Sequence, residues 1–122
     1  MLKNKEMKEY VLLFRMDISA KAKPNEAQMQ VYMRQWMEWM SEIESKGQLA
    51  NGGNHFSAKG KVLRPGGIVE DEPYTANKES VAGYIIILSE GLEDALAIAK
   101  KCPILQGEGT SVEVRETDTP GK

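Results

Sequence analysis

The stretch YIIIL, residues 84–88, decides the fold because it is the most apolar run in the chain. β-Branched and aromatic side chains at consecutive positions favour a strand, and neighbouring side chains of a strand point to opposite faces of its sheet. The run is apolar on both faces, which predicts a central strand that needs cover on each side. An acidic turn that contains a proline, DEPY at residues 71–74, precedes it.

A second strand is predicted over residues 9–16 (EYVLLFRM), which are rich in β-formers and also apolar on both faces. A long helix is expected to begin at Pro24-Asn25, where Gln28 stands in the position of a capping box, and to end at Lys46-Gly47. Its apolar residues recur at steps of three and four: Met29, Met33, Trp36, Met37, Met40 and Ile43. The four methionines are expected to fill irregular gaps in the core.

The glycine-rich region after this helix predicts long connections with short β-like pieces around residues 55–57, 61–63 and 68–69. After the YIIIL strand, a second helix is expected to end at Pro103. On one side it carries Leu92, Ala95, Leu96, Ala99 and Cys102. Residues 110–116 alternate between apolar and charged side chains, which is typical of an edge strand.

The order of these elements predicts an α+β protein with the βαββαβ topology of a ferredoxin-like sandwich. In that topology the strands at 9–16 and 84–88 are expected to be central and parallel, and they are the two strands that are apolar on both faces. Two helices cover only one face, which leaves Val11, Leu13 and either Ile85/Ile87 or Tyr84/Ile86/Leu88 without cover. A homodimer whose sheets pack face to face is therefore predicted, since an interface of about 800 Å² per subunit would bury this surface.

Length and composition fit one domain over residues 1–122, with flexible ends at 1–7 and 117–122. The net charge of −2 offers no basic field for phosphates, which argues against nucleic acid as a partner. A single cysteine excludes an intramolecular disulfide and favours a reducing compartment, so a cytoplasmic location is expected. The sequence shows neither a signal-peptide pattern nor the ~18 to 20 apolar residues of a spanning helix, so no membrane association is expected.

Several segments together resemble the YCII-related proteins, in particular the branch marked by an Asp-Gly-Pro-Phe signature. The resemblance runs from EYVLLF through GQLANGG to DEPYTANKESVAGYIII and SVEVRE, and it covers nearly the whole chain. The signature here is Asp71-Glu72-Pro73-Tyr74, with Glu72 in place of the glycine and Tyr74 in place of the phenylalanine. Because glycine in a turn often marks a positive φ, either this turn differs or Glu72 is strained.

The resemblance implies a ferredoxin-like α+β fold, a dimeric α/β barrel assembly and a cleft between sheet and loops that has been proposed as an active site. Some YCII-type proteins carry a His/Asp pair in that cleft. Proteins with a similar barrel include cofactor-free isomerases, dehalogenases and monooxygenases. Members of the branch often lie beside genes for extracytoplasmic-function sigma factors, which suggests a regulatory context, and the resemblance implies no single reaction.

His55 and Asp71 are the candidate catalytic residues. His55 is the only histidine, and an imidazole, with an ordinary pKa near 6.5, is a natural general base at neutral pH. Asp71 would orient it if the hairpin between them brings the two together. The alternative is that His55 is a half-exposed loop residue bonded to backbone and that Asp71 caps its own turn.

Tyr74, Trp36, Trp39 and Lys78 are the candidate ligand-binding residues. Tyr74 has an apolar ring and a polar tip that suit a pocket wall, and Trp39 is expected to line a cleft or an interface. The alternatives are core packing for Trp36 and a solvated ion pair with Glu79 for Lys78. One histidine and one cysteine do not make a metal site, and no nucleotide-binding motif occurs, so neither a metal nor a cofactor is expected.

Two functions remain as hypotheses. In the first, a homodimeric YCII-like protein uses His55 for cofactor-independent acid/base chemistry on a small molecule. In the second, the same pocket serves recognition alone, as a non-catalytic ligand-binding or regulatory module linked to sigma-factor signalling. Replacement of His55 distinguishes them, because only the first requires a proton transfer at this residue.

Overall fold

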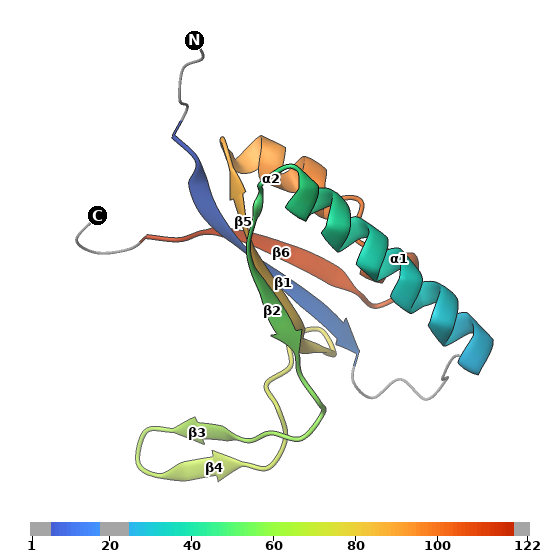
Figure 1. Cartoon of the computed structure of the whole chain (residues 1–122). Coiled ribbons are helices and arrows are strands. Elements are labelled where there is room, and N and C mark those ends of the chain that lie inside the picture. Colours follow the sequence, from blue (N-terminus) through green and yellow to red (C-terminus); the bar gives the residue numbers. More distant parts are fainter. Residues whose placement is uncertain (1–5, 18–24, 119–122) are drawn as a thin grey trace.

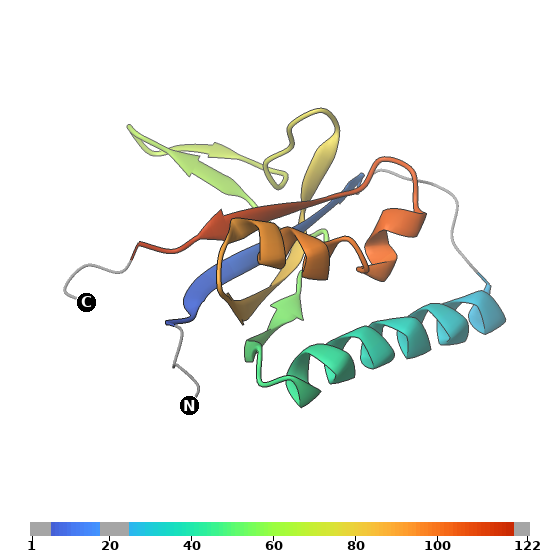
Figure 2. The same cartoon turned by 90° about the horizontal axis from the view of Figure 1, so that it is seen from above.

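A computed structural model describes residues 6–17 and 25–118, which form a four-stranded antiparallel sheet with two helices (Figure 1). In spatial order the sheet contains β2 (Leu49–His55), β5 (Glu79–Ser89), β1 (Lys8–Asp17) and β6 (Ser111–Glu116). The other elements are α1 (Glu26–Ser45), α2 (Leu92–Ala99), the 3₁₀ turn η1 (Pro103–Gln106) and a separate hairpin of β3 (Val62–Arg64) and β4 (Ile68–Glu70). Both helices lie on one side of the sheet (Figure 2), and the architecture is α+β and compatible with a ferredoxin-like topology.

The two central strands, β1 and β5, are antiparallel, and the expectation of a parallel central pair is wrong. The reason lies in the connections along the chain. β2 leads through the β3–β4 hairpin into β5, which pairs antiparallel with β2 and with β1 and so separates them. An antiparallel sheet can also contain strands that are apolar on both faces, so this pattern does not fix strand direction.

The start and end of α1 are as the sequence predicts. Asn25 Oδ1 accepts a hydrogen bond from the Gln28 backbone N–H at 2.7 Å, and the Asn25 N–H donates to Gln28 Oε1 at 2.9 Å, which completes the capping box. The helix ends at Ser45, and Gly47 follows with φ of +72°. Pro24 lies outside the described residues, as do residues 18–23 and the ends at 1–5 and 119–122.

The helix buries aromatic rings, and three of its four methionines are not core residues. Trp36 and Trp39 are buried, whereas Met29, Met33 and Met37 are 40%, 44% and 68% exposed. Met40 alone of the four packs against the core. The N-terminal half of α1 extends past the end of the sheet (Figures 1 and 2), so the apolar stripe continues beyond the surface that could cover it.

The main core lies between the sheet and the helices. The β1 and β5 side chains on this side are buried and lie opposite one another, with Tyr10 paired to Ile87 and Leu12 to Ile85. The alternate side chains of these strands point away from the helices and are only half-buried. We call this side the open face, and its apolar members are Val11, Leu13, Tyr84, Ile86 and Leu88.

Two boundaries differ from those predicted. The short strand expected around residues 55–57 is instead β2, which ends at His55 and contains the glycines and asparagines of LANGGNH. Helix α2 ends at Ala99, so Cys102 lies in the connection after it and Pro103 begins η1. Within the described ranges no helix is long and apolar enough to cross a membrane.

Candidate functional site

A cleft of about 950 Å³ lies between the N-terminal half of α1 and the adjoining end of the sheet. We call it the helix-side cleft. Its apolar wall includes Phe14, Tyr32, Trp36, Ala82 and Ile104. Its polar members include Gln35, His55, Gln106, Glu108 and Thr110. Residues from α1, β1, β2, β5, η1 and the loop before β6 therefore contribute to one hollow.

A bulge in β2 brings His55 to this cleft. Gly53 has φ of +65°, and a Cβ at this position would lie 1.6 Å from the Tyr84 carbonyl oxygen. Only glycine allows this backbone conformation together with such a close approach. The pairing register shifts between Asn51 and Asn54, after which His55 lies opposite Gly83. The imidazole thus belongs to the side of the sheet that faces α1.

Trp36 connects the rings on that side. The residue opposite Gly83 on β1 is Phe14, so Gly83 lies between Phe14 and His55 across the sheet. The Trp36 ring is edge-on to both, with centroids 5.0 Å from Phe14 and 5.8 Å from His55. Because Gly83 has no side chain, the β2 backbone can approach it closely; a Cβ there would lie 2.5 Å from the Asn54 carbonyl oxygen. A row of aromatic rings forms this wall, and His55 is its exposed outer end.

The Trp36 indole N–H is the one buried side-chain donor in the described part of the chain that makes no hydrogen bond. An unsatisfied buried donor costs about 1 to 3 kcal/mol, so native proteins rarely keep one without a purpose. Burial raises the pKa of the nearby Tyr32, an interaction with the Trp36 N–H lowers it, and the Cys102 thiol raises it further. Because the indole N–H has no partner within hydrogen-bond geometry, its interaction with the Tyr32 hydroxyl is longer or more bent than a hydrogen bond. Polar atoms of Tyr32 and Trp36 therefore lie close together in an otherwise apolar wall.

The far side of the cleft is formed by η1 and the loop that follows it. Gln106 Nε2 donates to Gln35 Oε1 at 2.9 Å, which joins η1 to α1. Thr110 Oγ1 donates to the Gly107 carbonyl at 2.8 Å and stabilises the loop. Cys102 is buried behind this wall, and burial raises the pKa of its thiol to about 12, which leaves it protonated and unreactive at neutral pH.

The structure does not bring Asp71 to His55. The Asp71 carboxylate accepts from Lys61 Nζ at 2.9 Å, and its side chain is 85% exposed. This ion pair closes the base of the β3–β4 hairpin. Asp71 is not among the residues that line the helix-side cleft, so the proposed pairing of the two catalytic candidates has no support from their contacts.

Tyr74 lies in a second hollow, the open-face cleft, of about 670 Å³. It lies between the root of the β3–β4 hairpin and the open face, where Arg15 and Glu113 form an ion pair at 2.8 Å. The Tyr74 side chain is exposed, and its carbonyl accepts from Ser80 Oγ at 2.6 Å. The sheet thus separates Tyr74 from His55, although sequence reasoning placed both in one pocket.

Strain at Glu72 was one of the two alternatives for the signature turn, and the backbone does not show it. Glu72 is not among the described residues with positive φ, so the replacement of glycine there causes no strain of this kind. The positive φ values belong to Asn77 (53°) and Lys78 (68°), between the paired residues Ala76 and Glu79. This pattern is that of a two-residue type I′ turn. Lys78 is exposed at its tip and does not line the helix-side cleft.

Trp39 lies in the core and lines none of the three hollows described here. Its indole N–H donates to the Ile98 carbonyl at 3.1 Å, which joins α1 to the last turn of α2. Of the predicted site residues, Trp36 and His55 therefore share the helix-side cleft. Sequence reasoning missed Gln35 of α1, Gln106 of η1, and Glu108 and Thr110 of the loop before β6, because a polar residue on a helix surface or in a loop carries no signal of which cleft it will line.

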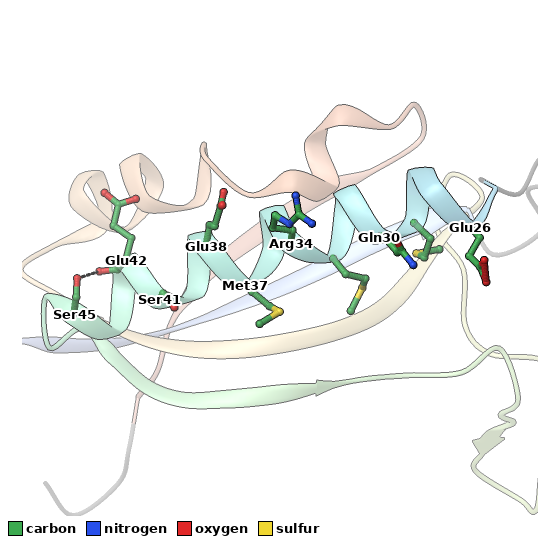
Figure 3. Close-up of a pocket in the computed structure, with 10 residues that line it drawn as sticks. Glu26, Gln30, Arg34, Met37, Glu38, Ser41, Glu42 and Ser45 are labelled. Carbon is green, nitrogen blue, oxygen red and sulfur yellow. Dashed lines mark hydrogen bonds between the residues drawn. The ribbon is translucent and has the colours of Figure 1, made fainter.

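A third hollow runs along the outer side of α1 and is formed by that helix alone (Figure 3). Figure 3 shows the Met37 thioether on one side of the helix and the side chains of Arg34, Glu38 and Glu42 on the other. A groove made by one helix has no opposing wall to enclose a ligand. No group of three or more histidine, cysteine, aspartate or glutamate side chains able to hold a metal occurs in the ranges that the structure describes.

These features define an α+β protein in which a cleft between helix and sheet has the size of a small-molecule site. The chain belongs to the YCII-related family, because the family model for the YCII-related domain matches residues 14–118. No curated protein matches the chain.

Proposed function

We propose that the helix-side cleft binds a small, mostly apolar molecule that carries a polar group, and that this binding is the function of the chain. The observation that carries the proposal is the buried Trp36 N–H without a partner, set in a wall of aromatic rings that ends at His55. The volume of about 950 Å³ is within the range of small-molecule sites.

The chemistry of the wall indicates what kind of molecule would bind. Phe14, Tyr32 and Trp36 present ring faces and edges, which favour a flat or aromatic ligand. His55 and the amides of Gln35 and Gln106 are the polar groups that would orient it. Binding through a few polar contacts in an apolar wall is typical of recognition sites that are largely formed before the ligand arrives.

Acid/base chemistry at His55 is the second candidate, because the imidazole is both exposed and in contact with the cleft wall. Asp71 pairs with Lys61, so a reaction of this kind would have to proceed without Asp71 as the orienting carboxylate. Glu108 is the carboxylate that lines the same cleft. A proton transfer between ligand and His55, with Glu108 assisting, is the form that this mechanism would take.

A fluorescence experiment tests the binding proposal. Trp36 and Trp39 are the only tryptophans, and only Trp36 lines the cleft, so Trp39→Phe leaves one reporter at the site. Small aromatic acids, phenols and amides titrated into this variant are expected to change its emission, with retained ligand also visible in native mass spectrometry. A variant that also carries Phe14→Ala should bind at least about tenfold more weakly.

Lys78→Ala is the matched control, because Lys78 is exposed and remote from the cleft wall. Absence of any emission change across the panel, and of any retained molecule, would overturn the proposal. His55→Ala then separates the two candidates. Loss of turnover with binding retained favours acid/base chemistry, whereas weaker binding with no turnover in the parent protein favours recognition alone.

We also propose that the chain forms a homodimer through the open face, as a dimeric α/β barrel in the cytoplasm. The half-buried apolar residues of that face support the pairing, because no helix of the described chain covers them. If the helix-side cleft only recognises its ligand, a regulatory role such as one in sigma-factor signalling would follow from binding alone.

A further inference from the structure

The hairpin of β3 and β4 stands apart from the rest of the molecule. Its strands pair only with each other among the described strands, and each has three residues. A two-stranded ribbon of this length is marginal in water unless something packs against it. At its base it is held by the Lys61–Asp71 ion pair, which is exposed and contributes little to stability.

The hairpin carries large apolar side chains that nothing in the described chain covers. Leu63 and Val69 lie directly opposite each other, so they share one face of the ribbon, and they are 73% and 50% exposed. Ile68 is 60% exposed. A cross-strand pair of this kind stabilises a ribbon far more when a third surface buries it. The ribbon therefore presents an apolar contact surface at a position that projects from the sheet.

The direction of this projection identifies what the surface would meet. Figure 2 shows the hairpin on the side of the sheet away from α1 and α2, which is the side of the open face. A second copy that packs its open face on this one through a twofold axis would lie beside the hairpin. Each hairpin would then extend past its own sheet and flank the sheet of its partner.

The area of the sheet supports the same conclusion. The longest strand has 11 residues and the sheet has four strands, so the open face spans on the order of 600 Å². A stable interface buries roughly 800 Å² on each partner. The flat area is a lower bound on the accessible surface of the open face, which therefore comes close to this size, and a hairpin contact from each subunit would add apolar area to it.

We propose that the β3–β4 hairpin is an arm that packs its Leu63/Val69 pair against a second copy of this chain. The inference rests on the proposed face-to-face homodimer and deepens it, because it assigns part of the interface to residues outside the sheet. Within the ribbon, the Arg64 guanidinium donates to both carboxylate oxygens of Glu70, at 2.9 and 3.2 Å, and the proposed contact would add apolar burial to this pairing. It also makes the open-face cleft, which lies at the root of the arm, part of the subunit interface.

Sedimentation equilibrium over a dilution series tests the arm. Leu63→Thr/Val69→Thr removes apolar surface and places a β-branched residue, which supports the ribbon, at both positions, and it is expected to raise the dimer dissociation constant at least about tenfold. Ile86→Lys, in the middle of the open face, should have a larger effect. Met37→Thr is the matched control, because Met37 is 68% exposed on the helical side of the molecule, and it should leave dissociation unchanged.

A second measurement reads the contact at position 63 directly and does not need the double variant. Cys102 is buried, so a polarity-sensitive fluorophore attached after Leu63→Cys labels position 63 selectively. Its emission is expected to shift towards that of an exposed dye as the protein is diluted below its dissociation constant. An emission that stays constant while the protein dissociates would contradict the proposed contact between the hairpin and the second copy.

The outcomes separate the arm from the dimer on which it rests. A parent protein that is monomeric throughout overturns both. Dissociation by Ile86→Lys, with no effect of the Leu63/Val69 double variant, overturns the arm and leaves the dimer standing. A dimer that none of these variants weakens overturns both the open-face interface and the arm.

Discussion

Leu12 and Leu13 are neighbouring leucines in β1 that point to opposite faces of one sheet. Leu12 is fully buried beneath the helices, whereas Leu13 lies on the open face and is only partly buried. The residue type and the strand are the same, so the difference comes entirely from what covers each face. On the covered face the incomplete fit of α1 leaves a cleft, and on the open face the absence of a helix leaves a surface for a partner.

The largest expected loss of stability comes from a substitution at Gly53, in the bulge that brings β2 and His55 to the covered face. Gly53→Ala would place a Cβ 1.6 Å from the Tyr84 carbonyl oxygen, so the β2–β5 pairing must shift. We expect a loss of at least about 4 kcal/mol in the free energy of unfolding, measured by urea denaturation.

Gly66→Ala is the control for this change, because Gly66 also has a positive φ, of +86°, but an added Cβ meets nothing within 4 Å. It should cost only about 1 kcal/mol, from backbone strain alone. Equal losses in the two variants would mean that close approach of β2 to Tyr84 does not matter.

The two leucines provide the direct test of the comparison. Leu12→Ala should reduce the free energy of unfolding by about 3 kcal/mol, because it leaves a cavity in a packed core. Leu13→Ala should cost about 1 kcal/mol in a dilute, monomeric sample, since its side chain is already partly in water. If Leu13→Ala costs as much as Leu12→Ala even at the lowest protein concentration, the two faces do not differ as described.

The two tryptophans of the covered face differ in whether the indole N–H has a hydrogen-bond partner. Trp39→Phe removes the hydrogen bond from Nε1 to the Ile98 carbonyl, whereas Trp36→Phe removes a donor that has no partner. We therefore expect Trp39→Phe to cost about 1 kcal/mol more in the free energy of unfolding than Trp36→Phe. Thermal denaturation followed by circular dichroism measures the difference, and the reverse order would contradict the unsatisfied state of Trp36.

The smallest expected effect on stability comes from the Arg15–Glu113 ion pair on the open face. The hydrogen bond from Arg15 holds the pKa of Glu113 below its ordinary value, with partial burial opposing the shift and Arg115 adding to it. A lowered folded-state pKa stabilises the protein above the ordinary carboxyl pKa of about 4.3, and that contribution is lost as the pH falls through the lowered value.

Glu113→Gln should remove this contribution, which is under about 1 kcal/mol because both side chains are partly exposed. Melting temperatures at about pH 7 and pH 3 measure it, and the parent protein should lose more on acidification than the variant. An identical pH dependence in the two proteins would show that the pair does not act on stability.

Local patterns in the sequence correctly predicted the elements whose residues have a high propensity for the structure that they adopt. The YIIIL strand, the strand around residues 9–16, the Asn25 capping box and the alternating last strand all occur in the structure. The bulged β2 did not follow from propensity, because glycine and asparagine disfavour strands and Gly53 is explained only by its contact with Tyr84.

The candidate site was predictable only in part. His55 and Trp36 lie together in the cleft, but Asp71 and Tyr74 were placed with them by distance along the chain, and the sheet separates the two groups. The methionines of α1 followed the helical period of the core, yet Met29 and Met33 are exposed in the half of the helix that extends past the sheet, and Met37 is exposed on a side of α1 that no other element covers.

By itself, the sequence determined both helices and the strands other than β2, that the two central strands are apolar on both faces, and that the chain resembles the YCII-related family to which it belongs. Those properties depend on neighbouring residues and on their periodicity. The tertiary structure alone decided which apolar face the helices cover, where the aromatic cleft opens, and that Asp71 serves the hairpin and not His55. Such choices depend on contacts between residues far apart in the chain, and no local pattern encodes them.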